Sequence, residues 1–395
     1  MIDSLLDTDL YKLTMQAVIS KHFADAVVEY TLSNRTDGMK FNKSAFEWLK
    51  EQVIALGDLR FSSEDIEYLR TAVPFLPAEY LDCLKEVELN PKKEVDLTLD
   101  NGDLIITVNG LWSTTILYEI PILALASEAY FKFVDTKWTV DGQELQAFNK
   151  CRKLLDIGCS FSEFGTRRRR SKETQKLVIQ GLVNGARNRE DENKLIGTSN
   201  IMFAREFGLK PIGTVAHELM MGIAAYDQDY KNANKRAMDV WLDTVGGKAA
   251  GFALTDTFGT PNFLQTFVPP YSDLYLGVRQ DSGDPVEYTQ LIAQHYKKLG
   301  YEANTKFILY SDSLNIETCT KYKHAAEANG LIPLFGIGTF LSNDFRNSDD
   351  PTVKSKPLNI VMKISKVNGY PAIKLSDNAS KNTGPPKRSK RSRRN

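Results

Sequence analysis

Five short apolar runs in the second part of the chain constrain its fold most, because each ends in a cluster of polar residues and glycines. The runs fall at residues 211–215, 251–254, 274–278, 307–310 and 332–335. Helical segments separate most of them, and the clearest spans 316–329, with Gly330 as the expected stop signal. Short strands that alternate with helices predict a parallel sheet.

The polar ends of these runs favour an irregular, TIM-like α/β barrel. In such a barrel, site residues gather at the carboxyl ends of successive strands. An open, doubly wound sheet also binds ligands at strand ends and is the alternative. We prefer the barrel, because at least five strand ends carry candidate site residues rather than one or two at a single crevice.

The first third of the chain has a different pattern. Residues 95–99 and 104–108 alternate in polarity on either side of Asn101-Gly102, which predicts a β-hairpin. Residues 120–134 are apolar over a length too great for one strand and predict a buried helix, with Pro121 in its first turn.

Composition excludes several classes of protein. The 395 residues are 42% hydrophobic and 25% charged, which is typical of a globular protein and not of a disordered or fibrous chain. No apolar run approaches the roughly 20 residues of a membrane helix, and the acidic N-terminus does not resemble a signal peptide. The four cysteines are scattered without a C-x-x-C pair, so we expect a reducing, cytoplasmic location and no zinc site.

Charge is balanced over the whole chain but not along it. Lys plus Arg and Asp plus Glu both total 50, and residues 384–395 contain several bases and no acid. The remaining body is therefore mildly acidic, which argues against a nucleic-acid-binding surface. The basic tail leaves a nuclear location open as well, and we expect it to be disordered.

Common phosphate and metal motifs are absent from the sequence. There is no P-loop and no complete G-x-G-x-x-G, and His217-Glu218 lacks the second histidine of a zinc protease motif. Any phosphate site must therefore be assembled from other elements.

Two candidate constellations contain a cation or an imidazole. Residues 164–170 combine Phe164 and a Gly-Thr pair with four arginines, which is either a solvated basic stretch or an anion site. Residues 213–218 place His217 directly after an apolar run, where an imidazole can act as a base or carry a phosphoryl group. A satisfied structural histidine is the alternative.

Two further constellations lie at later strand ends. Residues 279–284 offer a cation and carboxylates suited to sugar hydroxyls or Mg²⁺, although Asp284-Pro285 also fits a simple helix cap. Residues 336–339 contain Gly336, Gly338 and Thr339, which allow backbone N–H groups to approach a phosphate. Together the four constellations indicate a phosphorylated sugar substrate and a phosphoryl or pentosyl transfer.

On these motifs the chain strongly resembles the nicotinate phosphoribosyltransferase family, and it is most similar to the fungal and bacterial forms. The resemblance extends from about residue 8 to about residue 384. The motifs that carry it lie at residues 8–15, 164–168, 197–200, 213–218, 279–284, 311–315, 336–339 and 374–378.

The resemblance implies an irregular α/β barrel at residues 129–354 joined to a smaller α/β domain. Residues 1–128 would form that domain, and C-terminal strands within 355–383 would complete it. The resemblance also implies active sites shared within a homodimer, with the tyrosine segment contributed by the neighbouring copy.

The resemblance further implies a ligase-type reaction, in which nicotinate and phosphoribosyl pyrophosphate give nicotinate mononucleotide and pyrophosphate at the entry to NAD synthesis. ATP hydrolysis would be coupled to this transfer through transient phosphorylation of His217, and Mg²⁺ would share the phosphate charge. Nicotinate contacts are implied for Tyr11, Phe164, Thr214 and Arg279. Phosphate or phosphoribosyl contacts are implied for Arg167, Arg169, Asp281, Gly336, Gly338 and Thr339.

One departure from the family concerns residues 385–395, where family members continue into a helical stretch and this chain becomes basic. Several alternatives stay open. They are a nicotinamide- or quinolinate-using relative, a catalytically impaired form with an altered C-terminal segment, an unrelated barrel hydrolase, and a non-catalytic protein whose tail binds nucleic acid.

Overall fold

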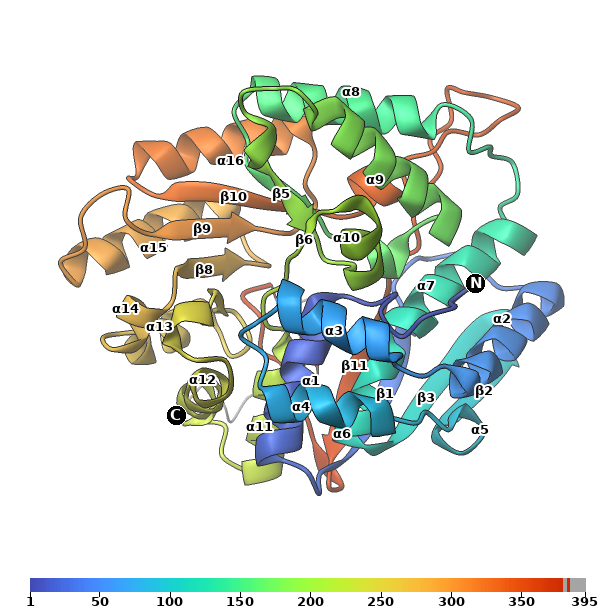
Figure 1. Cartoon of the computed structure of the whole chain (residues 1–395), viewed down its shortest axis with the longest axis horizontal. Coiled ribbons are helices and arrows are strands. Elements are labelled where there is room, and N and C mark those ends of the chain that lie inside the picture. The colour runs from blue at the N-terminus through green and yellow to red at the C-terminus, as the bar shows by residue number, and fades with distance from the viewer. Residues whose placement is uncertain (379–381, 384–395) are drawn as a thin grey trace.

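The computed structural model describes residues 1–378 and 382–383, so the predicted basic tail at 384–395 lies outside the described residues. Two β-sheets organise the molecule: one of five antiparallel strands and one of seven parallel strands. Figure 1 shows them in separate parts of the molecule, with the early strands of the chain in the antiparallel sheet. In the described part of the chain, no helix is long and apolar enough to cross a membrane.

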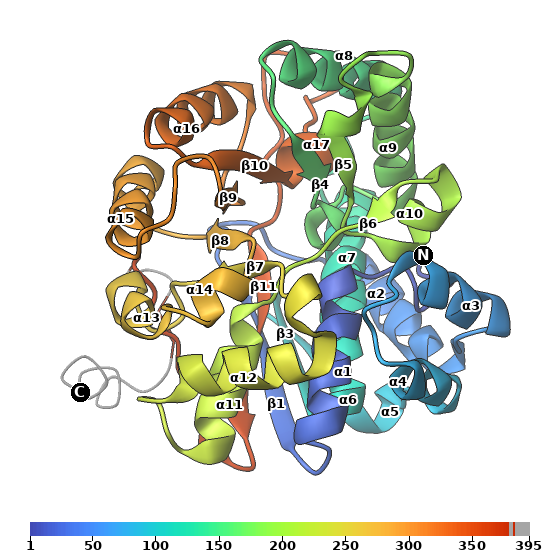
Figure 2. The same cartoon turned by 60° about the vertical axis from the view of Figure 1, so that its left-hand side comes forward.

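The parallel sheet has the order β6-β5-β4-β10-β9-β8-β7. Figure 2 shows helices α8 (Gln143–Asp156), α9 (Lys172–Ala186), α15 (Pro285–Lys298) and α16 (Ile316–Ala328) outside these strands. Within the described residues, no β-ladder joins β6 to β7, so the barrel is partial. The predicted irregular α/β barrel with a smaller second sheet is confirmed. Its strands are β4 (Phe161–Glu163), β5 (Leu195–Thr198), β6 (Lys210–Pro211), β7 (Phe252–Leu254), β8 (Gly277–Gln280), β9 (Phe307–Tyr310) and β10 (Ile332–Ile337).

Four of the five apolar runs overlap strands closely or in part, and the first run is mostly irregular. Strand β6 ends at Pro211, and the Ile212 N–H still donates to the Thr198 carbonyl of β5 at 2.8 Å. The chain then passes through residues 212–216, which bring the Thr214 hydroxyl to Arg279 at the candidate site. The run at 274–278 begins in the short helix α14 (Tyr271–Leu274), so its strand starts at Gly277. Strands β4 and β5 come in addition to the five runs.

The antiparallel sheet has the order β12-β11-β1-β3-β2. The predicted hairpin is confirmed: Asn101 and Gly102 take φ values of 49° and 83°, the left-handed backbone that a tight turn between two strands requires. Helices α2 (Lys43–Ala55) and α7 (Glu119–Phe133) pack together beside this sheet (Figure 1). The strands are β1 (Val27–Asn34), β2 (Val95–Asp100), β3 (Asp103–Leu111), β11 (Ile360–Val367) and β12 (Tyr370–Pro371).

Helix α7 is buried along nearly its whole length, as its apolar sequence predicts, with Pro121 in its first turn. Helix α16 ends at Ala328, and Gly330 follows with a φ of 69° as the expected stop signal. The other α-helices are α1 (Leu10–His22), α3 (Ser63–Ala72), α4 (Ala78–Cys83), α5 (Pro91–Glu94), α6 (Trp112–Thr115), α10 (Ile201–Phe207), α11 (His217–Asp227), α12 (Ala233–Val245), α13 (Thr260–Thr266) and α17 (Thr339–Ser342). Short 3₁₀ turns are η1 (Leu56–Asp58), η2 (Leu84–Glu86), η3 (Ile116–Tyr118), η4 (Thr166–Arg168), η5 (Glu192–Lys194) and η6 (Gly247–Ala249).

Candidate active site

His217 is the first residue of α11 and lies among side chains from three other segments. Its Nδ1 is 2.9 Å from the Thr257 hydroxyl, just after β7. Its Nε2 is 3.1 Å from Asp281 Oδ2, just after β8, and 2.8 Å from Lys374 Nζ near the end of the described chain. Because both strands are parallel, their carboxyl ends meet at one edge of the sheet and hold the imidazole there.

Burial favours a neutral imidazole at His217 beside ionised carboxylates, although the carboxylates themselves favour its charged form. Burial lowers the pKa of His217, with Lys374 acting in the same direction and Asp256 opposing it. Burial disfavours ionisation of Asp281, but Arg279 and His217 hold the pKa of that carboxyl well below its usual range. A neutral imidazole keeps one lone pair free, which is the form that can attack a phosphorus atom.

All three guanidinium nitrogens of Arg279 donate hydrogen bonds to neighbouring segments at this edge of the sheet. Nε donates to the Ser311 hydroxyl at 2.8 Å, Nη1 to the Thr214 hydroxyl at 2.8 Å, and Nη2 to Asp281 Oδ1 at 2.8 Å. Since Asp281 also contacts His217, one continuous hydrogen-bonded chain joins the loop after β6 to the ends of β7, β8 and β9. The structure therefore brings together four of the predicted residues: Thr214, His217, Arg279 and Asp281.

Asp256 lies next to His217, with its Oδ1 3.5 Å from His217 Nε2, and is almost completely buried. Its Oδ2 accepts from the Ser282 hydroxyl at 2.5 Å and the Ser376 hydroxyl at 3.1 Å, and it lies 3.5 Å from Lys374 Nζ. Among the described residues, its Oδ1 accepts no hydrogen bond. His217, Asp256 and Asp281 place one ligand atom each within 4.8 Å of one another.

Phe164 forms a second group at the same edge with Gly336, near the end of β10, and Gly338, just after it. The Phe164 N–H donates to the Ile337 carbonyl at 2.8 Å, and a Cβ added at Gly336 would lie only 2.4 Å from the Phe164 ring. A Cβ at Gly338 would lie 3.2 Å from the Phe164 carbonyl oxygen. The absence of side chains at these glycines therefore allows the aromatic ring to lie against the backbone, with Thr339 at the start of α17.

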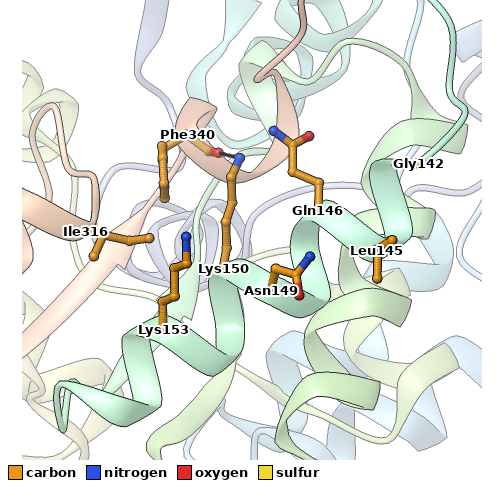
Figure 3. Close-up of a pocket in the computed structure, with 8 residues that line it drawn as sticks. All are labelled: Gly142, Leu145, Gln146, Asn149, Lys150, Lys153, Ile316 and Phe340. Atoms are coloured by element: carbon orange, nitrogen blue, oxygen red, sulfur yellow. Dashed lines mark hydrogen bonds between the residues drawn. The ribbon is translucent and has the colours of Figure 1, made fainter.

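A hollow of about 490 Å³ lies between α8 and Phe340 of α17. Figure 3 shows Lys150 reaching from α8 to the Phe340 carbonyl, to which its Nζ donates at 2.6 Å. The same Nζ lies 2.7 Å from Asp344 Oδ2. Lys150 thus fixes the backbone of Phe340, one residue after Thr339. It supports the candidate active site and does not belong to the group of side chains around His217.

Tyr11 approaches this edge from α1, and Arg167, in η4 just after β4, lies near Tyr11. A Cβ at Gly213 would lie 3.0 Å from the Tyr11 backbone nitrogen, so α1 passes directly beside the loop that carries Thr214. Within the described residues, the buried Tyr11 hydroxyl has no hydrogen-bond partner. Burial disfavours the charge on Arg167, but Tyr11 and Glu119 nearby raise the pKa of Arg167.

Arg169 is the predicted phosphate ligand that the structure separates from the others. Its side chain is completely buried, and both terminal nitrogens donate to Asp7 at 2.8 Å while Nη1 also donates to Gln175 at 3.0 Å. A guanidinium enclosed in this way offers no open face to a ligand. We therefore assign Arg169 to the core and leave it out of the proposed site.

The arginine-rich segment also does not open a helix directly. Residues 166–168 form the 3₁₀ turn η4, and α9 begins only at Lys172 after the N-cap Ser171. The last arginine, Arg170, has its guanidinium carbon 3.7 Å from the Phe131 ring centroid. Only Arg167 and Arg168 of the four remain partly exposed.

Four polar contacts of this site were not assigned from the sequence: Asp256, Thr257, Ser311 and Lys374. The first three follow β7 and β9 directly, so their position after an apolar run was an available signal. Lys374 belongs to the motif at 374–378, but local pattern could not predict its contact with His217, which is 157 positions away in the sequence.

Comparisons with known proteins agree on one family. The model of the nicotinate phosphoribosyltransferase (NAPRTase) family matches residues 159–395, and the model of its N-terminal domain matches residues 6–127. A nicotinate phosphoribosyltransferase of Saccharomyces cerevisiae is 52% identical over 99% of this chain and 94% of its own length. One from Methanosarcina mazei is 39% identical over 97% of this chain and 95% of its own.

Solved structures are similar over the whole fold as well. A crystal structure from Saccharomyces cerevisiae, assigned as a nicotinate phosphoribosyltransferase, has a TM-score of 0.97 at 52% identity and covers 99% of this chain and 97% of its own. The Porphyromonas gingivalis nicotinate phosphoribosyltransferase has a TM-score of 0.91 at 32% identity, covering 99% of this chain and 98% of its own. This chain therefore belongs to the nicotinate phosphoribosyltransferase family.

Proposed function

We propose that the chain transfers the phosphoribosyl group of phosphoribosyl pyrophosphate to nicotinate, releasing nicotinate mononucleotide and pyrophosphate. The observation that carries the proposal is the hydrogen-bonded chain Thr214–Arg279–Asp281–His217 at the carboxyl edge of the barrel. It combines a cation for a carboxylate with an imidazole that can accept a phosphoryl group. Family membership and the names of the relatives support the same activity.

Nicotinate would lie between Arg279 and Phe164. Arg279 and the Thr214 hydroxyl would bind its carboxylate, since a guanidinium fork matches a carboxylate in shape and charge. Phe164 would stack on the pyridine ring, and Tyr11 would close the site from α1. These contacts would hold the ring nitrogen ready to attack the anomeric carbon, so that transfer would begin from an aligned pair.

Phosphoribosyl pyrophosphate would occupy the part of the edge near β10. The backbone N–H groups around Gly336 and Gly338 and the Thr339 hydroxyl suit its 5′-phosphate. Arg167 would neutralise the departing pyrophosphate, on which charge increases as the ribosyl bond breaks. Asp281 lies close enough to Arg279 and His217 to contact the ribose hydroxyls or an accompanying cation.

His217 would couple ATP hydrolysis to the transfer. Its Nε2 lone pair would form a bond to the γ-phosphorus of ATP as the bond to the bridging oxygen breaks, and the electron pair would leave with ADP. The ring would keep its proton on Nδ1, next to the Thr257 hydroxyl. A phosphate on His217 changes the charge of the site and so changes its affinity for phosphoribosyl pyrophosphate and product.

Mg²⁺ is the cation that the phosphate substrates imply, and the residues present fit it. The buried Asp256 Oδ1 has no hydrogen bond among the described residues, and Asp281 lies within reach of the same point. Both would hold the ion through carboxylate oxygens, which Mg²⁺ prefers. When bound, the ion would supply charge neutralisation for the phosphates.

The test is the synthesis of labelled mononucleotide from labelled nicotinate and phosphoribosyl pyrophosphate, with and without ATP. Nicotinamide and quinolinate are offered in parallel at the same concentration. We expect product from nicotinate alone and a higher rate with ATP. Equal or faster use of nicotinamide or quinolinate would contradict the proposed substrate, and no effect of ATP would contradict the coupling.

A further inference from the structure

We propose that Glu218 is a positioning residue for His217, and that its buried hydrogen bonds fix the start of α11 so that the imidazole is held at the candidate active site. The inference rests on the proposed ATP-coupled function and adds to it a side chain that does not touch the reacting atoms. It is carried by the convergence of donors from α1, β1 and α6 on the Glu218 carboxylate.

The Glu218 carboxylate is buried and accepts hydrogen bonds at both of its oxygens. Its Oε2 accepts from Lys12 Nζ at 2.5 Å. Its Oε1 accepts from the Tyr30 hydroxyl at 2.6 Å and from Trp112 Nε1 at 2.8 Å. Glu218 is 8% exposed, and its three partners are at most 1% exposed. Because water does not compete for these donors, the carboxylate is held firmly from three directions.

Helix α11 depends on these bonds because its N-terminus has no side-chain cap. The N-cap residue is Ala216, which offers no oxygen to the N–H groups of the first turn, and helix ends without such partners fray. One turn after Glu218, a Cβ added at Gly222 would lie only 2.2 Å from the Trp112 ring. The first turns of α11 therefore lie directly against the residue that donates to Glu218.

The directions of the two neighbouring side chains separate their roles. Consecutive residues of a helix point about 100° apart, so Glu218 meets α1, β1 and α6 while His217 meets Thr257 and Asp281 at the barrel edge. Glu218 thus acts on the reaction through the backbone that it shares with His217. Phosphoryl transfer needs the imidazole in line with the γ-phosphorus, and a displacement of about 1 Å can slow such a step about a hundredfold.

Two substitutions disturb this arrangement to different degrees. In Glu218→Gln, the amide NH₂ must face either the Lys12 ammonium or the Trp112 N–H, and neither group can accept a hydrogen bond. Tyr30→Phe is milder, because it removes one hydroxyl and keeps the ring in the core. Lys12 is a less specific target, since it also pairs with Glu119 beside the proposed pyrophosphate site.

The matched control is Tyr118→Phe. Tyr118 is as buried as Tyr30, and its hydroxyl donates to Glu94 of α5 at the same distance of 2.6 Å. Each change therefore removes one buried hydrogen bond between a hydroxyl and a carboxylate. A purely structural role of Glu218 predicts similar losses in urea unfolding for both variants and no difference between them in the labelling of His217.

The first measurement compares the rate of base-stable labelling by γ-labelled ATP with the rate of mononucleotide synthesis without ATP. We expect labelling to slow about tenfold in Tyr30→Phe and about a hundredfold in Glu218→Gln, as for a displaced reacting group. The ratio of labelling to ATP-independent synthesis should fall in both variants, and Tyr118→Phe should keep the wild-type ratio. Equal ratios in Tyr30→Phe and Tyr118→Phe would overturn the proposal.

The second measurement does not depend on ATP. The chain has four histidines, so protein labelled with ¹³C-histidine gives four ring signals, and His217→Ala identifies the signal of His217. At one fixed pH, we expect this signal to shift or broaden in Glu218→Gln and Tyr30→Phe and to stay in place in Tyr118→Phe. An unmoved signal in Glu218→Gln would overturn the inference. If wild type takes no label while the signal behaves as expected, the phosphohistidine has failed and the positioning of His217 by Glu218 stands.

Discussion

At the scale of single residues, the Arg279 side chain holds several segments of the candidate site together. Its three donor contacts join Thr214, Asp281 and Ser311, so one guanidinium orders the loop before α11 and the ends of two strands. A lysine could not make these contacts together, because its ammonium is a point charge on a flexible stem.

Arg279→Lys should therefore weaken nicotinate binding even though the charge is kept. We expect a loss of about 1.5–3 kcal/mol, the usual contribution of a charge-assisted hydrogen bond. The measurement is the apparent affinity for nicotinate at saturating phosphoribosyl pyrophosphate. An unchanged affinity would show that Arg279 is not the carboxylate partner.

His217→Ala should separate ATP coupling from ribosyl transfer. We expect it to abolish both base-stable labelling by γ-labelled ATP and the stimulation by ATP, while a lower, ATP-independent rate remains because the phosphate-binding residues are kept. His217→Glu should not restore the coupling, since a carboxylate is not an imidazole that cycles between free and phosphorylated forms. Base-stable label that persists in His217→Ala would identify another residue as the acceptor.

At the scale of elements, hydrogen bonds to Glu163 hold the turn after β4 in place. Glu163, the last residue of β4, accepts from the Gly165 N–H at 2.6 Å and from the Thr198 hydroxyl of β5 at 2.6 Å. Burial raises the pKa of Glu163 to about 7, and the nearby Asp9 acts in the same direction. The turn that presents Phe164 and Arg167 is thus anchored by a carboxyl that titrates near neutral pH.

Stability should depend on the protonation of Glu163. The folded state raises its pKa from 4.5 to about 7, so the stabilisation is present at low pH and is lost as pH rises through 7. Between pH 5 and pH 8 we expect wild type to lose up to about 2.5 kcal/mol relative to Glu163→Gln, which has no proton to release. Urea unfolding at both pH values measures this, with Glu51→Gln, an exposed position of α2, as control. A difference that does not change with pH would contradict the assignment.

Gly336, near the end of β10, provides a second test of how elements support the site. In Gly336→Ala the new Cβ would lie 2.4 Å from the Phe164 ring, so the ring must move. We expect the KM for nicotinate to rise about tenfold, with a loss of about 1–3 kcal/mol in the free energy of unfolding, as for other overpacked sites. If steric conflict with the ring is the cause, Gly336→Ala combined with Phe164→Leu should cost less than the sum of the two changes. Simple additivity would argue against this contact.

At the scale of the whole molecule, local pattern predicted the residues that follow barrel strands and missed those that depend on distant packing. His217, Arg279 and Thr339 could be predicted because polar residues after an apolar run lie at the edge of a parallel sheet. Lys374 and the burial of Arg169 could not, since the partner of Arg169, Asp7, is 162 positions away. The chemistry of an arginine run does not reveal which of its members face the core.

The antiparallel sheet bears on both the proposed domain boundaries and the proposed homodimer. Strands β11 and β12 share a sheet with β1, which supports assigning residues 355–383 to the same unit as residues 1–128. In that sheet, Val27 and Leu111 are cross-strand neighbours and are 50% and 47% exposed, an apolar pair that a second copy would cover.

We therefore expect a solution mass of twice 44.5 kDa by light scattering. Leu111→Asp should shift the protein toward the single-chain mass, because a charge replaces apolar surface at the contact. Thr98→Asp, an exposed change on β2 of the same sheet, is the control. A single-chain mass for wild type would contradict the dimer, and an unaffected mass for Leu111→Asp would place the contact elsewhere.

The position of β11 also has a consequence for the order in which the chain can fold during its synthesis. Strand β1 pairs with β3 on one side and with β11 on the other, and Val27 bonds to Asn368, 341 positions further along. While a ribosome is still making the barrel, one edge of β1 has no strand beside it, and an open edge can pair with another nascent chain. The antiparallel sheet is the first to begin and among the last to be completed. The barrel is therefore translated while that edge of β1 is still unpaired.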